Sequence, residues 1–145
     1  MEFDNSFTVE KPIDEVWNTM IDLERVVPAV PGARVIEKTG DRAVNAEVKI
    51  KLGAMSMNYS GPAEIVEQDD SDHRAVMDAR AKEAGGQGNA AAKVSMQLTG
   101  TGDATEVALH SQIDVTGKAA QMGEGVIVAV TEGMIKEFAE NLAKL

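Results

Sequence analysis

Few residues in this sequence are capable of acid–base or nucleophilic chemistry, and they stand far apart. The chain contains two histidines, His73 and His110, and no cysteine. His110 follows Leu109 in an alternating stretch and should point away from the core, whereas His73 lies at a polar turn. A solvated surface role accounts for both histidines, and no pair stands at metal-ligand spacing. We therefore expect no catalytic residue, no metal site and no cofactor.

Tyr59 is the best candidate for a polar group that faces inward. Its hydroxyl could hydrogen-bond a ligand carbonyl, or a backbone carbonyl could satisfy it within the protein. The pair Gly117-Lys118 is similar to the end of a phosphate-binding loop. However, Gln112 and Ala119 occupy the positions where that motif requires Gly and Ser or Thr. The sequence therefore predicts no nucleotide-phosphate site.

Methionine is frequent in this chain relative to aromatic residues. There are 8 Met against one Trp, one Tyr and three Phe. Methionine is flexible and suits a cavity that adapts to an irregular guest, although it also fills gaps in a core that is poor in aromatic residues. Both explanations stay open at this point, and the first makes the inward apolar positions candidates for the wall of a ligand cavity. The candidate ligand contacts are Trp17, Ile50, Met57, Tyr59, Met77, Met96, Leu98, Leu109, Val130, Met134 and Phe138.

The period of the hydrophobic pattern defines the elements that must position these residues. Residues 2–10 read as a strand, and residues 13–20 and 22–27 as two short helices. From residue 33 onward the pattern alternates through six strands separated by turn residues. Residues 118–144 then repeat at helical spacing. One helix can cover seven strands only if the sheet wraps around it. The sequence therefore predicts an α+β fold in which a curved seven-stranded antiparallel sheet surrounds a long C-terminal helix.

Three glycines interrupt the predicted C-terminal helix: Gly123, Gly125 and Gly133. Each costs about 1 kcal/mol relative to alanine inside a helix, so a compensating reason is expected. Close packing of the helix on the sheet is one explanation, and a thin-walled pocket mouth is the other. Packing is the better explanation for Gly133.

Size and charge restrict the class of protein and its partners. We expect the 145 residues to form a single domain, residues 1–145. The net charge of −10 disfavours nucleic acid as a partner and disfavours electrostatic attachment to anionic lipid. No stretch is typical of a signal peptide or approaches the roughly 20 apolar residues of a membrane span. We expect a cytoplasmic protein.

Several motifs make the chain resemble known families. The opening resembles the START and polyketide-cyclase superfamily, the helix-grip proteins related to the birch-pollen allergen. These residues are Phe7-Thr8-Val9, Pro12 and Glu15-Val16-Trp17. More specific motifs resemble the family of the carbon monoxide dehydrogenase G-subunit. They are Asp22 to Pro28 leading into Pro31-Gly32, Leu52-Gly53, Tyr59-Ser60-Gly61, Gly117 to Gly123, and Phe138. The resemblance covers essentially the whole chain.

The resemblance implies a cavity for apolar molecules between the sheet and the long helix. It also implies association with a molybdenum-containing hydroxylase such as carbon monoxide dehydrogenase, through membrane recruitment or handling of lipid quinone. We expect a non-catalytic carrier of an apolar, lipid-like ligand, with quinone as one candidate. It would contact the inner membrane face only transiently. Two alternatives stay open: a cyclase- or hydratase-type enzyme of the same fold, and an assembly factor for the molybdenum enzyme that holds no ligand.

Overall fold

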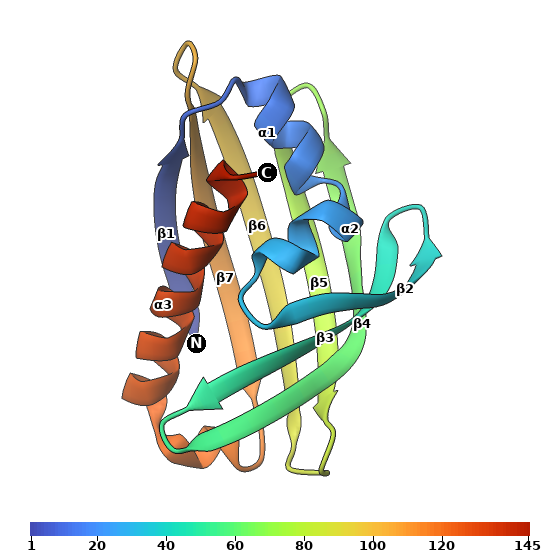
Figure 1. Ribbon diagram of the computed structural model, residues 1–145, viewed down its shortest axis with the longest axis vertical. Coiled ribbons are helices and arrows are strands. Elements are labelled where there is room, and N and C mark those ends of the chain that lie inside the picture. The colour runs from blue at the N-terminus through green and yellow to red at the C-terminus, as the bar shows by residue number, and fades with distance from the viewer.

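The computed structural model describes residues 1–145, and its elements follow the expected order of one strand, short helices, six strands and a long helix (Figure 1). The elements are β1 (Glu2–Val9), α1 (Ile13–Met20), α2 (Leu23–Val26), η1 (Val27–Ala29), β2 (Ala33–Gly40), β3 (Ala43–Leu52), β4 (Met55–Asp69), β5 (Arg74–Glu83), β6 (Asn89–Gly100), β7 (Thr105–Val115), η2 (Ala119–Met122) and α3 (Glu124–Ala143).

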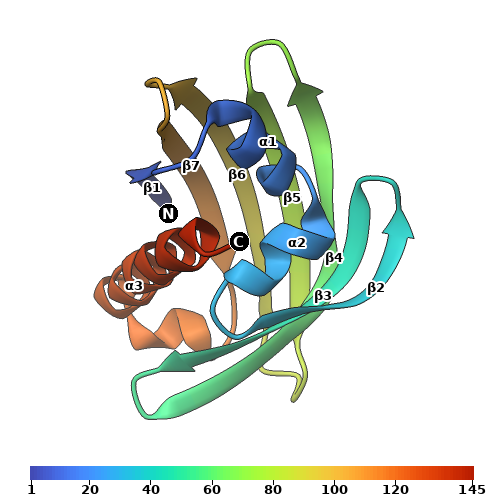
Figure 2. The same cartoon turned by 45° about the horizontal axis from the view of Figure 1, so that its top comes forward.

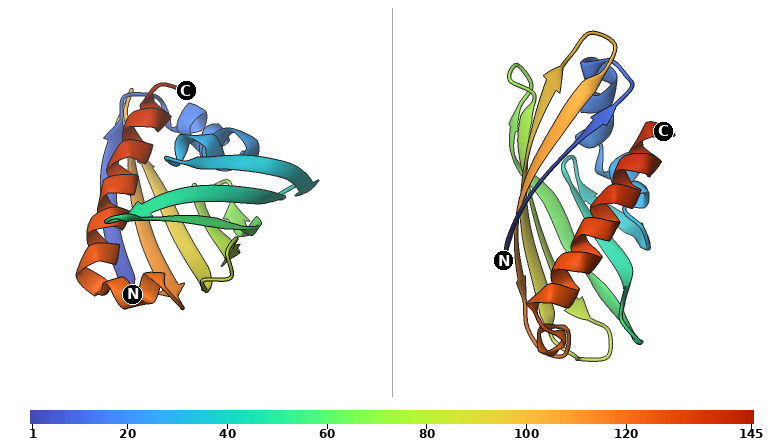
Figure 3. Two further views of the ribbon diagram at one scale, coloured as in Figure 1. Left: turned by 60° about the horizontal axis from the view of Figure 1, so that its bottom comes forward. Right: turned by 90° about the vertical axis from the view of Figure 1, so that its left-hand side faces the viewer.

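All seven strands form one antiparallel sheet in the order β1-β7-β6-β5-β4-β3-β2. Strand β1 pairs with β7, with Val9 opposite Thr105, and thereby places the N-terminal strand at one edge. Helix α3 packs against β1, β3 and η1, so a single helix contacts strands near both edges of the sheet. Figure 2 shows the sheet curving around α3, and Figure 3 shows α3 crossing the open side. The expected α+β fold, with a curved seven-stranded sheet around a C-terminal helix, is confirmed.

Two features of β4 explain how the sheet bends. The pairing of β4 with β5 shifts register between Ile65 and Glu67, where a bulge increases the local twist. Earlier in the strand, Gly61 lies so close to β5 that an added Cβ atom would sit 2.0 Å from the carbonyl oxygen of Arg80. Only glycine permits this approach, because any side chain would collide with the β5 backbone.

The two short helices follow β1 and cover one end of the sheet. Helix α1 begins after Pro12, which has no N–H to leave unpaired at a helix start, and it buries Trp17. The second helix is shorter than expected. The Asp22 side chain accepts a hydrogen bond from the backbone N–H of Glu24 and caps a four-residue α2. The chain then tightens into η1, which contains Pro28.

The C-terminal helix is shorter than its hydrophobic pattern predicts. Residues 119–122 form the 3-10 turn η2, and Gly123 then adopts φ 92° and ψ 152°. This backbone conformation is essentially restricted to glycine, and it interrupts helical hydrogen bonding. Helix α3 therefore begins at Glu124 and spans 20 residues, roughly 30 Å. The prediction of one helix over residues 118–144 is wrong for residues 118–123.

The buried side chains form two groups on the concave side of the sheet. The larger group contains 18 residues and includes the apolar faces of α1, α2 and the C-terminal part of α3. There the rings of Phe7 and Phe138 meet edge to face, with centroids 6.1 Å apart. The smaller group, at the other end of the sheet, consists of Leu52, Met57, Tyr59 and Ala119. Members of both groups contribute to the cavity described next.

Candidate functional site

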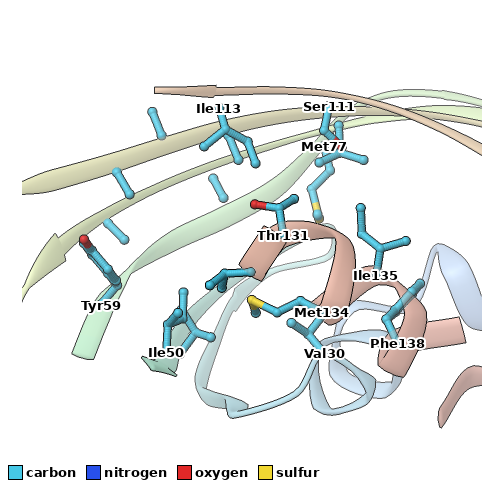
Figure 4. Close-up of a pocket in the computed structure, with 18 of the residues that line it drawn as sticks. Val30, Ile50, Tyr59, Met77, Ser111, Ile113, Thr131, Met134, Ile135 and Phe138 are labelled. Carbon is cyan, nitrogen blue, oxygen red and sulfur yellow. The ribbon is translucent and has the colours of Figure 1, made fainter. Parts of the chain in front are cut away.

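A cavity of about 390 Å³ lies between α3 and the concave face of the sheet (Figure 4). Twenty-seven residues line it, and 25 of them are hydrophobic. The lining comes from the five strands β3 to β7, from α3, from single residues of α1, α2, η1 and η2, and from Val30, which follows η1. The volume falls in the range of small-molecule pockets, about 300–1,000 Å³, which are lined mainly by apolar side chains.

The cavity follows from the way α3 is supported. The helix contacts β1 and β3, which lie near opposite edges of the sheet, and η1 closes one side. Beneath the helix, β5 and β6 carry small side chains: Ala79 pairs with Ala92, and Ala81 pairs with Ala90. All four alanines line the cavity and are only half-buried. Because a methyl group cannot span the distance to α3, space is left between the two layers.

Most of the residues expected to contact a ligand meet at this cavity. Eight of the eleven line it, from β3 to β7 and from α3: Ile50, Tyr59, Met77, Met96, Leu109, Val130, Met134 and Phe138. Elements that lie far apart in the sequence are brought together because the sheet curls. The four alanines of β5 and β6 were not among the expected contacts. The alternating pattern places them on the inward face, but it does not show that their small size leaves room for a cavity.

Three of the expected contacts lie outside the cavity lining. Trp17 is 4% exposed, and its Nε1 donates a hydrogen bond to Asp70 Oδ1 at 3.0 Å, so α1 is tied to the turn after β4. The Trp17 ring meets the ring of His73 edge to face at 5.5 Å. Met57 is enclosed in the smaller buried group, and Leu98 is enclosed in the larger one. These three side chains are apolar and inward, but other side chains already cover them.

The polar groups of the cavity are three hydroxyls, on Tyr59, Ser111 and Thr131. Figure 4 shows Tyr59 at one end and Phe138 at the other, with Thr131 between them and its hydroxyl turned toward the Tyr59 end. Ser111 is 4% exposed. No charged side chain lines the cavity. Because burying an unpaired charge is costly, the cavity suits an uncharged guest.

The Tyr59 hydroxyl has no hydrogen-bond partner, although it is buried. Of the two explanations open from the sequence, satisfaction by a backbone carbonyl does not occur. Burial, and secondarily the negative charge of Glu83, raise the pKa of Tyr59 above its usual value. The hydroxyl therefore stays protonated at neutral pH and is a hydrogen-bond donor. An orphaned buried donor is unfavourable, and a partner with an acceptor oxygen would relieve it.

The two histidines lie away from the cavity. On the outer face of the sheet, His110 Nδ1 is 2.7 Å from Asp4 Oδ1 and His110 Nε2 is 3.2 Å from Glu2 Oε1. Its hydrogen bond with Asp4, above all, raises the pKa of His110. His73 packs on Trp17, and its Nε2 lies 3.5 Å from an Asp14 oxygen. No group of three or more His, Cys, Asp or Glu side chains is arranged to hold a metal ion.

Neither explanation for the helix glycines fits the structure. A Cβ atom added at Gly123, Gly125 or Gly133 would meet nothing within 4 Å, so none of them allows close packing on the sheet. None of the three lines the cavity. Gly123 is required by its backbone conformation, whereas Gly125 and Gly133 lie on the exposed face of α3. None of the helices combines the length and the apolar character that a membrane span requires.

Solved structures with the same fold are numerous, at low sequence identity. A conserved protein from Geobacillus kaustophilus superposes with a TM-score of 0.88 at 19% identity, covering 99% of this chain and 93% of that one. The Zhui aromatase/cyclase from a Streptomyces species has a TM-score of 0.71 at 10% identity, covering 99% and 92%. A START superfamily protein from Mycobacterium smegmatis has a TM-score of 0.66 at 8% identity, covering 99% and 94%.

These neighbours establish the START-like helix-grip fold, which the chain shares with an aromatase/cyclase and with a START superfamily protein. No curated protein sequence matches the chain. Residues 6–145 match the sequence profile of one family, described as the G-subunit of carbon monoxide dehydrogenase, or CoxG. Several residues of the motifs that resemble this family line the cavity, among them Tyr59 on β4 and Phe138 on α3. The chain therefore belongs to the CoxG family, named for the G-subunit of carbon monoxide dehydrogenase.

Proposed function

We propose that residues 1–145 form one ligand-binding domain, a non-catalytic carrier for an apolar, lipid-like molecule. The observation that carries this proposal is the cavity of about 390 Å³, with 25 of its 27 lining residues hydrophobic and none charged. An apolar guest that fills this space gains roughly 25 cal/mol for each Å² of apolar surface removed from water. The contacts expected from the sequence that line the cavity, such as Met77, Met96 and Met134, are the proposed ligand contacts.

The family name supports a more specific role beside a redox enzyme. We propose that the protein works with a molybdenum-containing hydroxylase such as carbon monoxide dehydrogenase, and that a quinone is a candidate ligand. We also propose a cytoplasmic location with at most transient contact with the inner membrane face. The net charge of −10 favours transient contact, because an acidic surface is repelled by anionic lipid.

The test is to purify the protein from its own cells and identify what the cavity holds. Native mass spectrometry followed by organic extraction should reveal about one lipid-like molecule per chain. Val130→Trp adds bulk inside the cavity, and we expect it to lower ligand retention at least tenfold. The matched control is Val128→Trp, on the same helix but outside the lining, which should retain the ligand. Protein that is always empty and that binds no added quinone or long-chain alcohol would contradict the carrier proposal.

A second candidate is an enzyme of cyclase or hydratase type, because the fold is shared with the Zhui aromatase/cyclase. Such chemistry requires a general acid or base whose pKa lies near the working pH. The cavity offers only the hydroxyls of Tyr59, Ser111 and Thr131, and the pKa of Tyr59 is raised further. The carrier proposal therefore takes precedence. An assembly factor without a ligand is the third candidate, and the extraction experiment separates it from a carrier.

A further inference from the structure

A second hollow, of about 490 Å³, lies where the β5–β6 turn meets the chain between β7 and η2, at one end of the sheet (Figure 1). None of its seven lining residues is hydrophobic, and none of them lines the apolar cavity. The side chains that line it are those of Gln87, Thr116, Lys118 and Gln121, beside three glycines. We call it the polar hollow. The pair Gly117-Lys118 does not belong to a nucleotide-binding loop, but the fold brings it beside the β5–β6 turn.

Backbone contacts fix the two walls of the polar hollow against each other. The Lys118 N–H donates to the Gln87 carbonyl at 2.8 Å, and the Thr116 N–H donates to the Asn89 carbonyl at 2.9 Å. A Cβ atom added at Gly88 would lie 2.1 Å from the Thr116 carbonyl oxygen, so the two segments approach too closely for a side chain at this position. The four polar side chains therefore extend from a backbone framework whose halves separate only if these hydrogen bonds break.

The polar hollow carries a positive charge in a strongly acidic protein. Lys118 is its only charged residue, and this exposed side chain forms no ion pair with a carboxylate. No Asp or Glu lines the hollow, although the chain contains 24 of them. The nearby Glu83 carboxylate accepts hydrogen bonds from the backbone N–H groups of Asn58 and Gly85, at 3.0 and 2.7 Å, which offset part of its charge. The electrostatics of the hollow therefore suit an anion.

We propose that the polar hollow binds a phosphate group. The Lys118 ammonium group and the amides of Gln87 and Gln121 supply donors from both walls, and a phosphate has enough oxygens to accept from several donors at once. A carboxylate offers only two oxygens, in one plane. The Thr116 hydroxyl is already engaged with the backbone of Asn89 and is not one of these donors. This site lies outside the apolar cavity and does not depend on the carrier function.

The first experiment measures the melting temperature while sodium phosphate replaces sodium chloride at constant ionic strength. Phosphate stabilises folded proteins generally because it is excluded from their surfaces, and Lys118→Ala should keep only this general effect. At ten times Kd, phosphate should raise the Tm of the unaltered protein by about 4–5 °C more than that of Lys118→Ala. Gln121→Ala should weaken the affinity about two- to tenfold. The control Lys136→Ala makes the same change in net charge on the exposed face of α3, and it should show the full rise.

The second experiment identifies the source of the phosphate by flotation with vesicles of phosphatidylcholine, with and without phosphatidic acid. Binding to the vesicles with phosphatidic acid that Lys118→Ala abolishes would support the site with a lipid headgroup as its ligand. A phosphate response without vesicle binding would support the site with a soluble phosphate compound. Val130→Trp, which fills the apolar cavity, should keep the phosphate response and so separates this site from the carrier function.

Two outcomes would overturn the phosphate site. An equal rise in Tm for the unaltered protein and Lys118→Ala would show that phosphate acts only through its general effect on folded proteins. An equal loss of the response in Lys118→Ala and Lys136→Ala would show that net charge, and not the polar hollow, determines the response.

Discussion

Replacing Gly133 with alanine should stabilise this protein, and the same change at Gly123 should destabilise it. Both glycines lie in or at the start of α3, and an added Cβ atom would meet nothing within 4 Å at either position. Packing therefore makes no difference between them. They differ in backbone conformation: Gly133 is inside the helix, whereas Gly123 has φ 92° and ψ 152°. The pair isolates the backbone contribution of a glycine from its contacts.

The magnitudes follow from helix propensity and backbone strain. Alanine is favoured over glycine by about 1 kcal/mol in a helix interior, so Gly133→Ala should raise the free energy of unfolding by about that amount. With an unfolding entropy of about 2.1 cal/mol/K per residue, 145 residues give a rise in Tm of roughly 3 °C. At Gly123 a side chain is forced into a region that is essentially restricted to glycine, which costs about 1–3 kcal/mol.

The assay is thermal and urea denaturation followed by circular dichroism, with ligand titration on the same samples. Ligand affinity should be unchanged in Gly133→Ala, because Gly133 is exposed and does not line the cavity. A lower Tm for Gly133→Ala would refute the assignment of this glycine to an unpacked helix face. A change in affinity would show that helix flexibility at this position serves ligand entry.

Two further predictions concern contacts that hold elements together. The hydrogen bond to Asp4, above all, raises the pKa of His110 in the folded protein. The protonated ring therefore stabilises the fold fully at a pH below the unfolded-state pKa of about 6.5. This stabilisation is lost as the pH rises through the raised pKa of the folded state. The Tm difference between the protein and His110→Gln should therefore shrink from pH 6 to pH 8, and a difference that grows over this range would contradict the assignment. Asn141 Nδ2 donates to the carbonyl of Ala29 at 2.9 Å and ties α3 to η1, and Asn141→Ala should cost about 1–3 kcal/mol in urea denaturation. Glu140 is exposed and next to Asn141, and Glu140→Ala should change the free energy of unfolding by no more than about 0.5 kcal/mol. Equal effects of the two substitutions would argue against a stabilising role of the Asn141 hydrogen bond.

The hydrophobic period and the turn residues predict most of the elements, because helices, strands and turns depend largely on neighbours along the chain. Alternation of apolar and polar residues identified strands such as β3, and helical spacing identified α1 and most of α3. The start of α3 was misplaced because the apolar stripe continues through Met122 into η2. A hydrophobic pattern does not reveal the positive φ of Gly123. Gly123 lies between η2 and α3, where the chain passes from β7 to the C-terminal helix.

The sequence pattern predicts which side chains of the candidate site point inward. It does not predict which of these inward side chains line a cavity. Met96 and Leu98 lie two residues apart on the same face of β6, yet only Met96 lines the cavity. Trp17 is expected from the sequence to face a ligand. In the structure its side chain instead joins α1 to the turn after β4, through a hydrogen bond to Asp70.

The sequence by itself determined the apolar face of most strands and helices, and the family. Only the tertiary structure decided where space remains. The cavity is the space between two surfaces, the alanines of β5 and β6 on one side and helix α3 on the other. Its size depends on how far the curled sheet holds α3 from these alanines. That distance is set by the contacts of α3 with β1 and β3, two strands that lie far from α3 in the sequence.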